Sequence, residues 1–247
     1  MAVVLLPLPA ADVDPTESGV PWRTLSERGH HVVVATPDGR PAQADPRMLT
    51  GRGLGPFAPF LVADRHGREA YRAMAASREF AAPLPWEAIA ALAYDALLLP
   101  GGHAPGMRPY LESPLLQRAV AESFAAGKPV AAICHGVVLA ARSRRTDGRS
   151  VLHGRRTTAL PRRMELAAWW LTRAWLGSYY RTYPVTVEGE VTEALAAPAH
   201  FERGPASLRR DAPGQLDRGF TVRDGHYLSA RWPGDAHRLA AEFAAML

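Results

Sequence analysis

Cys134 is the only cysteine of the sequence and the residue that most clearly could do chemistry. It ends a short apolar run at 129–133 and is followed by His135 and by Gly136, which is small enough to let a helix approach a strand closely. A cysteine at such a sharp strand-to-helix turn lies near the positive end of the helix, where a thiolate is favoured. The alternative is a buried thiol that packs as a small apolar side chain. The adjacent histidine favours the reactive thiol.

Other residues that could do chemistry also follow predicted strands. Gly101, Gly102 and His103 come directly after one apolar run, and Glu17 comes shortly after another. The carboxyl ends of parallel strands meet at one edge of a sheet, so we expect these residues to lie close to Cys134. The backbone N–H groups of the two glycines, with those of the helix that starts after the cysteine, are suited to binding a developing oxyanion.

Short apolar runs alternate with helix-like segments in the first half of the chain. The runs lie at 3–8, 31–36, 94–99 and 129–133, and the helix-like segments between them include 20–29, 68–77, 86–92 and 115–126. Such alternation predicts a mainly parallel sheet with helices on both faces, that is, an α/β, flavodoxin-like three-layer sandwich. The turn at Cys134 is then the nucleophile elbow of this fold.

The second half of the chain has a less regular pattern. Residues 136–143 are predicted to form the helix after the elbow, 156–159 a strand, and 165–180 an aromatic-rich helix whose stripe suits a core or an oligomer interface. Runs at 220–222 and 227–230 flank a turn as a hairpin, and 235–247 is predicted as a final helix. We expect one domain over 1–247, with a variable helical and loop segment at about 165–218.

Composition narrows the class of protein. The chain has 247 residues, 47% of them hydrophobic, and a net charge of +5 carried largely by arginine. Its densest basic stretch holds no aromatic residues, so no nucleic-acid partner is expected.

One cysteine cannot form an intrachain disulfide, which fits a reducing, cytoplasmic compartment. The apolar opening is interpreted as a strand, and no membrane span is expected. The nine histidines are dispersed, so we expect no metal and no other cofactor.

Five motifs, in order, resemble the DJ-1/PfpI (ThiJ/PfpI) superfamily, whose members are also described as type 1 glutamine amidotransferase-like. They are Asp14-Pro15-Thr16-Glu17, Ala35-Thr36-Pro37-Asp38-Gly39, Leu99-Pro100-Gly101-Gly102-His103, Ala132-Ile133-Cys134-His135-Gly136 and Ala230-Arg231-Trp232-Pro233-Gly234. The resemblance spans nearly the whole chain and is weakest in the segment 165–218. It implies a homodimer that acts on a small molecule.

The resemblance also implies roles for individual residues. Cys134 matches the nucleophile, and Glu17 matches the protonated carboxyl that stabilises its thiolate. His135 matches the histidine of the protease-like and glyoxalase III/chaperone-like branches, in which a later acid orients it. Glu165 matches that acid by its spacing, although a surface residue at a helix start is an equal alternative. Leu160 stands where the parkinsonism-associated branch has a histidine, which places the chain nearer the other two branches.

The resemblance implies a cysteine-dependent, cofactor-free enzyme that converts a 2-oxoaldehyde into a 2-hydroxy acid, as glyoxalase III does. The same residues suit a Cys-His-acid amidase or peptidase. An oxidative-stress sensor or chaperone whose cysteine is oxidised, and a specialised biosynthetic enzyme, stay open as further alternatives.

Overall fold

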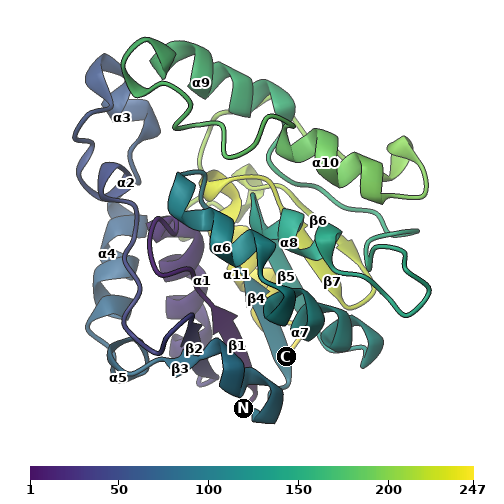
Figure 1. Cartoon of the computed structure of the whole chain (residues 1–247). Helices are drawn as coiled ribbons and strands as arrows, with labels where there is room; N and C mark the ends of the chain where they lie inside the picture. The colour runs from purple at the N-terminus through teal and green to yellow at the C-terminus, as the bar shows by residue number, and fades with distance from the viewer.

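A seven-stranded sheet lies at the centre of the computed structural model, which describes residues 1–247 (Figure 1). The strands are β1 (Val3–Pro7), β2 (His31–Thr36), β3 (Leu84–Pro85), β4 (Ala96–Leu99), β5 (Val130–Ile133), β6 (Thr221–Asp224) and β7 (Tyr227–Ala230). Their order is β3-β2-β1-β4-β5-β7-β6, and β6 with β7 is the antiparallel pair. The predicted mainly parallel sheet and C-terminal hairpin are confirmed.

Helices cover both faces of the sheet, as the three-layer prediction requires. The chain moves from β1 to β2 in one direction across the sheet and from β4 to β5 in the other. Right-handed crossovers in opposite directions place their helices on opposite faces. Accordingly α1 (Pro15–Glu27) packs with α4 (Arg65–Ala75) and α11 (Ala236–Ala244), whereas α7 (Pro114–Ala125) packs with α8 (Gly136–Arg142), which also contacts α6 (Arg108–Glu112). None of the helices combines the length and apolar character needed to cross a membrane.

The central strands are almost wholly aliphatic because both of their faces are covered. Every residue of β4 and β5 is buried, and both strands belong to the main hydrophobic core. Strands buried on two faces are continuous apolar runs rather than alternating ones. These two strands hold the segments that carry Gly101 and Cys134 at fixed positions at one edge of the sheet.

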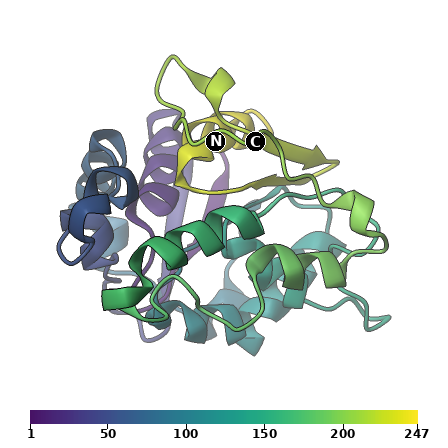
Figure 2. The ribbon, with the colours of Figure 1, turned by 90° about the horizontal axis from the view of Figure 1, so that it is seen from above.

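Two further helices lie over the carboxyl ends of the parallel strands. These are α9 (Arg162–Leu176) and α10 (Val187–Ala194), seen above the sheet in Figure 1 and from above in Figure 2. The short helices α2 (Pro46–Thr50), α3 (Ala58–Leu61) and α5 (Arg78–Ala81) belong to the segment between β2 and β3. On α9, Trp170 and Trp175 are exposed, whereas Trp169 packs against a small buried cluster that contains Tyr179, so only part of the aromatic stripe belongs to the core.

Three sequence-based assignments differ from the structure. Residues 156–159 form no strand: Thr157 makes only an isolated bridge, through its N–H to the His200 carbonyl and its carbonyl to the Glu202 N–H, and the Thr158 N–H donates to Ser229 Oγ. The first helix begins at Pro15, earlier than predicted, because Asp14 caps it. The segment Trp86–Ala91 is a 3₁₀ helix rather than an α-helix.

Candidate functional site

The turn at Cys134 has the geometry of a nucleophile elbow. Its φ of 56° lies in the left-handed region, which side-chain-bearing residues rarely adopt, and its N–H continues the ladder by donating to the Ala230 carbonyl at 3.1 Å. A Cβ on Gly136 would lie 2.1 Å from the Leu99 carbonyl oxygen, so only glycine lets α8 start this close to β4. The strained backbone therefore holds the sulfur at the edge of the sheet, at the start of α8.

This backbone strain has a measurable consequence for stability. We expect Cys134→Gly to be more stable than Cys134→Ala by about 1 kcal/mol, because glycine adopts a positive φ without a Cβ clash. Urea unfolding of the two variants measures the difference. An alanine variant at least as stable as the glycine variant would show that the turn is not strained.

Glu17 lies against Cys134 as a buried carboxylic acid. Asp14 caps α1 by accepting the backbone N–H groups of Thr16 and Glu17, which fixes the first turn of the helix at the site. The Glu17 Oε2 atom accepts the N–H of Gly101 at 2.9 Å, and Oε1 has no nitrogen or oxygen partner. Burial, and then the nearby Asp14 charge, raise the pKa of Glu17 well above its usual range. The protonated carboxyl can therefore donate to the Cys134 sulfur.

The Cys134 thiol is a weaker acid than an ordinary cysteine. Burial raises its pKa well above the usual range, followed by the Glu17 and Asp14 carboxyls, and the His135 N–H opposes this shift only in part. Burial thus opposes the thiolate that the helix start was expected to favour. The sulfur needs a base that accepts its proton.

His135 presents a nitrogen to that proton. Its Nδ1 atom lies 3.4 Å from the Cys134 sulfur, and its Nε2 atom lies 3.0 Å from Thr182 Oγ1. The Thr182 hydroxyl donates its only proton to the His103 carbonyl at 2.6 Å, so it accepts from Nε2. Burial, followed by His103 and Arg142, lowers the pKa of His135 to about 3, so the ring is neutral. The neutral ring thus carries its proton on Nε2 and turns the Nδ1 lone pair to the thiol.

Glu165 does not contact His135, which corrects the expected triad. It lies in the first turn of α9, and its Oε1 pairs with Arg181 Nε at 3.3 Å while its Oε2 accepts the Val187 N–H at 2.9 Å. Thr182, and not Glu165, is the partner of the His135 ring. Glu165 lines the same cavity as Cys134 but acts there as a link between α9 and the start of α10.

The buried position of Glu165 predicts a pH-dependent stability. Burial raises its pKa to about 7 from an ordinary 4.5, so between these values the folded state holds a proton that the unfolded state has lost. Its contribution therefore falls as pH rises through this window, by about 2 to 3 kcal/mol between pH 5 and pH 8. We expect Glu165→Gln to lose less stability than the wild type over that range in urea unfolding. An identical loss would refute the assignment.

The glycine loop after β4, residues 101–103, provides other groups to the site than the two oxyanion-binding N–H groups expected from the sequence. The Gly101 N–H is committed to Glu17, so it cannot also bind an oxyanion, which corrects that expectation. The Gly102 N–H makes no hydrogen bond within the protein, and Gly102 lines the cavity with Cys134. The His103 ring also lines this cavity, stacked on Tyr180 with the ring centroids 4.3 Å apart. Gly102 and His103 are thus the members of this loop that face the site.

Cys134 opens into a mainly apolar cavity of about 300 Å³. Its polar wall includes Asp14, Glu17, His103, Cys134 and Arg210, and its apolar wall is built by α3, α9 and the loops that follow. The apolar residues include Phe57, Phe60, Leu61, Leu160, Met164, Ala168, Leu171 and Leu208. A cavity of this kind next to a nucleophile is the default position for a small-molecule substrate.

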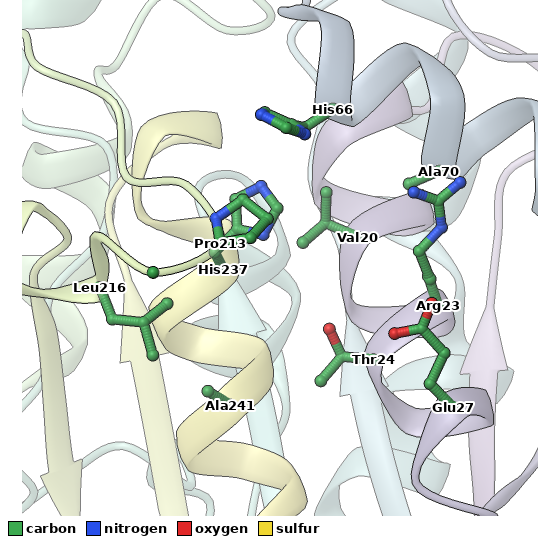
Figure 3. Close-up of a pocket in the computed structure, with 11 residues that line it drawn as sticks. Val20, Arg23, Thr24, Glu27, His66, Ala70, Pro213, Leu216, His237 and Ala241 are labelled. Atoms are coloured by element: carbon green, nitrogen blue, oxygen red, sulfur yellow. The ribbon is translucent and has the colours of Figure 1, made fainter.

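A second cavity, of about 220 Å³, lies between α1, α4 and α11 and contains none of the predicted site residues (Figure 3). His66 and His237 line it, with ring centroids 5.8 Å apart, edge to face. Burial lowers the pKa of His237 to about 4. No group of three or more His, Cys, Asp or Glu side chains in the structure is placed to hold a metal ion, here or at Cys134.

The family comparison agrees with this geometry. A model described as "ThiJ/PfpI family-like" matches residues 8–205, a span that contains Glu17, the glycine loop, the elbow and Thr182. The chain belongs to the ThiJ/PfpI-like family. A Pyrococcus abyssi protein described as a deglycase is 30% identical to this ThiJ/PfpI-like protein over 159 residues, which is 64% of this chain and 72% of that one.

Solved structures share the fold of this ThiJ/PfpI-like protein over essentially its full length. The rapid encystment protein of Francisella tularensis superposes with a TM-score of 0.70 at 16% identity, covering 100% of this chain and 99% of the other. Glyoxalase III of Candida albicans superposes with a TM-score of 0.65 at 19% identity, covering 100% and 97%. At these identities the likeness establishes the fold of the family.

Three residues of the site in this ThiJ/PfpI-like protein were not found from the sequence. Thr182 follows α9 and lies 47 positions from His135, in a segment without a recognisable pattern. Tyr180 and Arg210 line the cavity from irregular segments. No local signal marks a threonine or an arginine in a loop, so only the folded chain identifies them.

Proposed function

We propose that this protein is a cofactor-free enzyme that converts a 2-oxoaldehyde and water into a 2-hydroxy acid. The observation that carries the proposal is the hydrogen-bonded series Glu17, Cys134, His135 and Thr182, of which Glu17 and Cys134 line the cavity. The names of two similar proteins, a deglycase and a glyoxalase III, support chemistry on reactive carbonyls. In this proposal Cys134 is the nucleophile and His135 the base.

The reaction begins when the thiol proton passes to His135 Nδ1 and the sulfur bonds to the aldehyde carbon. Glu17 donates to the sulfur, and the Gly102 N–H is the protein donor available to the developing oxyanion. His135, or a group it relays to, then moves a proton from the aldehyde carbon to the adjacent carbon, which turns the hemithioacetal into a 2-hydroxy thioester. Water cleaves the thioester, releasing the acid and restoring the thiol, so no oxidant or reductant is consumed.

The role of Thr182 separates this mechanism from a triad that uses Glu165. We expect Thr182→Val to lower kcat by about 10- to 100-fold, because the His135 Nε2–H loses its acceptor and the ring its orientation. Thr182→Ser should restore most of the rate, and Glu165→Gln should change kcat by less than about fivefold at pH 7. The measurement is lactate formation from methylglyoxal, with the pH profile of kcat for each variant. A large loss in Glu165→Gln with an intact rate in Thr182→Val would reverse the assignment.

The same residues suit amide hydrolysis, so the products decide the reaction class. Purified protein is incubated without glutathione, once with methylglyoxal and once with peptide and simple amide substrates. The proposal expects lactate from the first and no release of amine from the second. Amine release that requires Cys134, without any lactate, would replace the proposal by the amidase alternative.

A further inference from the structure

The cavity at Cys134 is much larger than a three-carbon substrate requires. A 2-oxoaldehyde of five non-hydrogen atoms displaces about three water volumes, roughly 90 Å³. The cavity encloses about 300 Å³, and thirteen of its twenty lining residues are hydrophobic. The excess volume is apolar and continuous with the nucleophile.

The wall of the cavity holds buried polar groups that lack partners. His103 Nε2, the Tyr180 hydroxyl, Arg210 Nη1 and Trp232 Nε1 are all buried without a hydrogen bond, and all four residues line the cavity. Buried polar groups without partners are costly, so their concentration at one site marks where a ligand or water completes them. Guanidinium and indole N–H groups only donate. The missing partner is therefore a group rich in acceptor oxygens.

Arg210 is held in place for such a group without being neutralised by an ion pair. Its Nη2 donates to the carbonyl oxygens of Phe60 and Val62 at 3.4 and 3.1 Å, and its guanidinium lies over the Trp232 ring, 5.3 Å from the centroid. Asp14 lies on the same wall, but its Oδ1 is used by the capping N–H groups of α1. Arg210 therefore keeps Nη1 free to bind an oxygen of a ligand.

The cavity also has a rim of exposed apolar side chains. Phe60 of α3, Leu171 of α9 and Leu208 are 76%, 45% and 73% exposed, and all three line the cavity. Figures 1 and 2 show α3 and α9 as neighbours above the sheet. Large apolar side chains that gather at the mouth of a cavity are typical of a binding site for an apolar group. The exposed rim and the unpaired donors thus line one cavity.

We infer that this cavity takes an amphipathic 2-oxo compound, with adjacent oxygen acceptors held by Arg210, Tyr180 and Trp232 and an aromatic or long aliphatic tail between α3 and α9. The inference rests on the proposed function for the placement of the reacting carbon beside Cys134. The tail is the occupant of the rim because the apolar residues of the rim and the nucleophile Cys134 line one cavity of a single chain. Phenylglyoxal is then a better substrate than methylglyoxal.

Equilibrium binding tests the inference without depending on turnover. Calorimetry compares benzoylformate with pyruvate, two 2-oxo acids that differ only in a phenyl or a methyl group. We expect benzoylformate to bind at least about 10-fold more tightly than pyruvate, because its phenyl group makes apolar contacts that a methyl group cannot make. Equal affinities, to within about twofold, or no binding of either acid would overturn the inference. If the chain forms a dimer that covers Phe60 and Leu208, and this dimer does not bind benzoylformate more tightly than pyruvate, the inference is also overturned.

Matched variants locate the two ends of the ligand. Ala168→Trp fills the cavity and should reduce the preference for benzoylformate to near unity, whereas Ala174→Trp, on an exposed position of the same helix outside the cavity, should keep it. Arg210→Gln should weaken both acids by about 10-fold or more, and Arg209→Gln should weaken neither. Circular dichroism verifies that each variant is folded. Similar effects within either pair would contradict the proposed orientation.

Turnover separates this inference from the proposed function. Mandelate formed from phenylglyoxal at a higher kcat/KM than lactate from methylglyoxal supports both. A binding preference for benzoylformate without any hydroxy acid product refutes the proposed reaction and leaves the amphipathic site standing. Lactate formation with no preference for phenyl compounds in rate or binding refutes the inference alone.

Discussion

Replacing Cys134 by serine is expected to lower kcat/KM for a 2-oxoaldehyde by at least about 10³-fold, because a serine hydroxyl is a far weaker nucleophile than a thiol. His135 Nδ1 is a neutral acceptor 3.4 Å from the sulfur, and a hydroxyl holds its proton more tightly against such a weak base. The serine side chain is similar in size and fits the same buried site. The measurement is the initial rate of hydroxy acid formation across a range of substrate concentrations.

The stability of the same variant is its control. Cys134→Ser should unfold in urea within about 1 kcal/mol of the wild type, because it leaves no large cavity and the hydroxyl can donate to His135. A rate loss with an unchanged fold then reports the nucleophile alone. A serine variant that keeps more than about a tenth of the wild-type rate would remove Cys134 from the mechanism.

Removing one partner of the buried Arg231–Asp235 pair is expected to destabilise the protein by about 3 to 5 kcal/mol, because an unpaired charge then stays in the core. Both side chains are 0% exposed, and the guanidinium donates to the two Asp235 oxygens at 2.8 Å each. Arg231 Nη1 also donates to the Pro205 carbonyl at 2.7 Å, and Asp235 accepts the Phe220 N–H. The pair therefore links the end of β7 to the start of β6 and to the loop that contains Pro205.

Urea unfolding of Arg231→Met and Asp235→Leu, alone and together, measures the effect. The double variant should lose less stability than the sum of the two single variants, because no unpaired charge remains. Arg118→Met is the matched control, since Arg118 pairs with Glu122 at 2.9 Å on an exposed helix face, where such a pair contributes less than about 1 kcal/mol. A loss at Arg231 no larger than at Arg118 would contradict the account.

Much of the fold follows from local patterns in the sequence. The strands β4 and β5 are continuous buried aliphatic runs, β1 and β2 are mainly aliphatic, and the helices between them have apolar residues at helical spacing. The elbow was predicted because a strand, a cysteine and a small glycine are adjacent in the chain. The edge strand β3 has only two residues and shows no such pattern.

The part of the site that was predicted wrongly depends on long-range contacts. Glu165 has a suitable spacing from Cys134, but the fold turns its carboxylate to Arg181 and the start of α10. Thr182 reaches His135 only because the chain returns over the sheet after α9. Likewise the pKa of Cys134 is set by burial, which a position in the sequence does not reveal.

The most direct test of the proposed reaction is a count of products per enzyme. Wild-type protein and Cys134→Ser are each incubated with ¹³C-labelled methylglyoxal in buffer without glutathione or metal, and the carbon NMR spectrum is followed with time. The account predicts one lactate for each methylglyoxal consumed, many turnovers for each wild-type molecule, and no enzymatic lactate from the serine variant. Lactate that never exceeds one equivalent of Cys134, or that forms equally in both samples, would contradict catalysis by this cysteine.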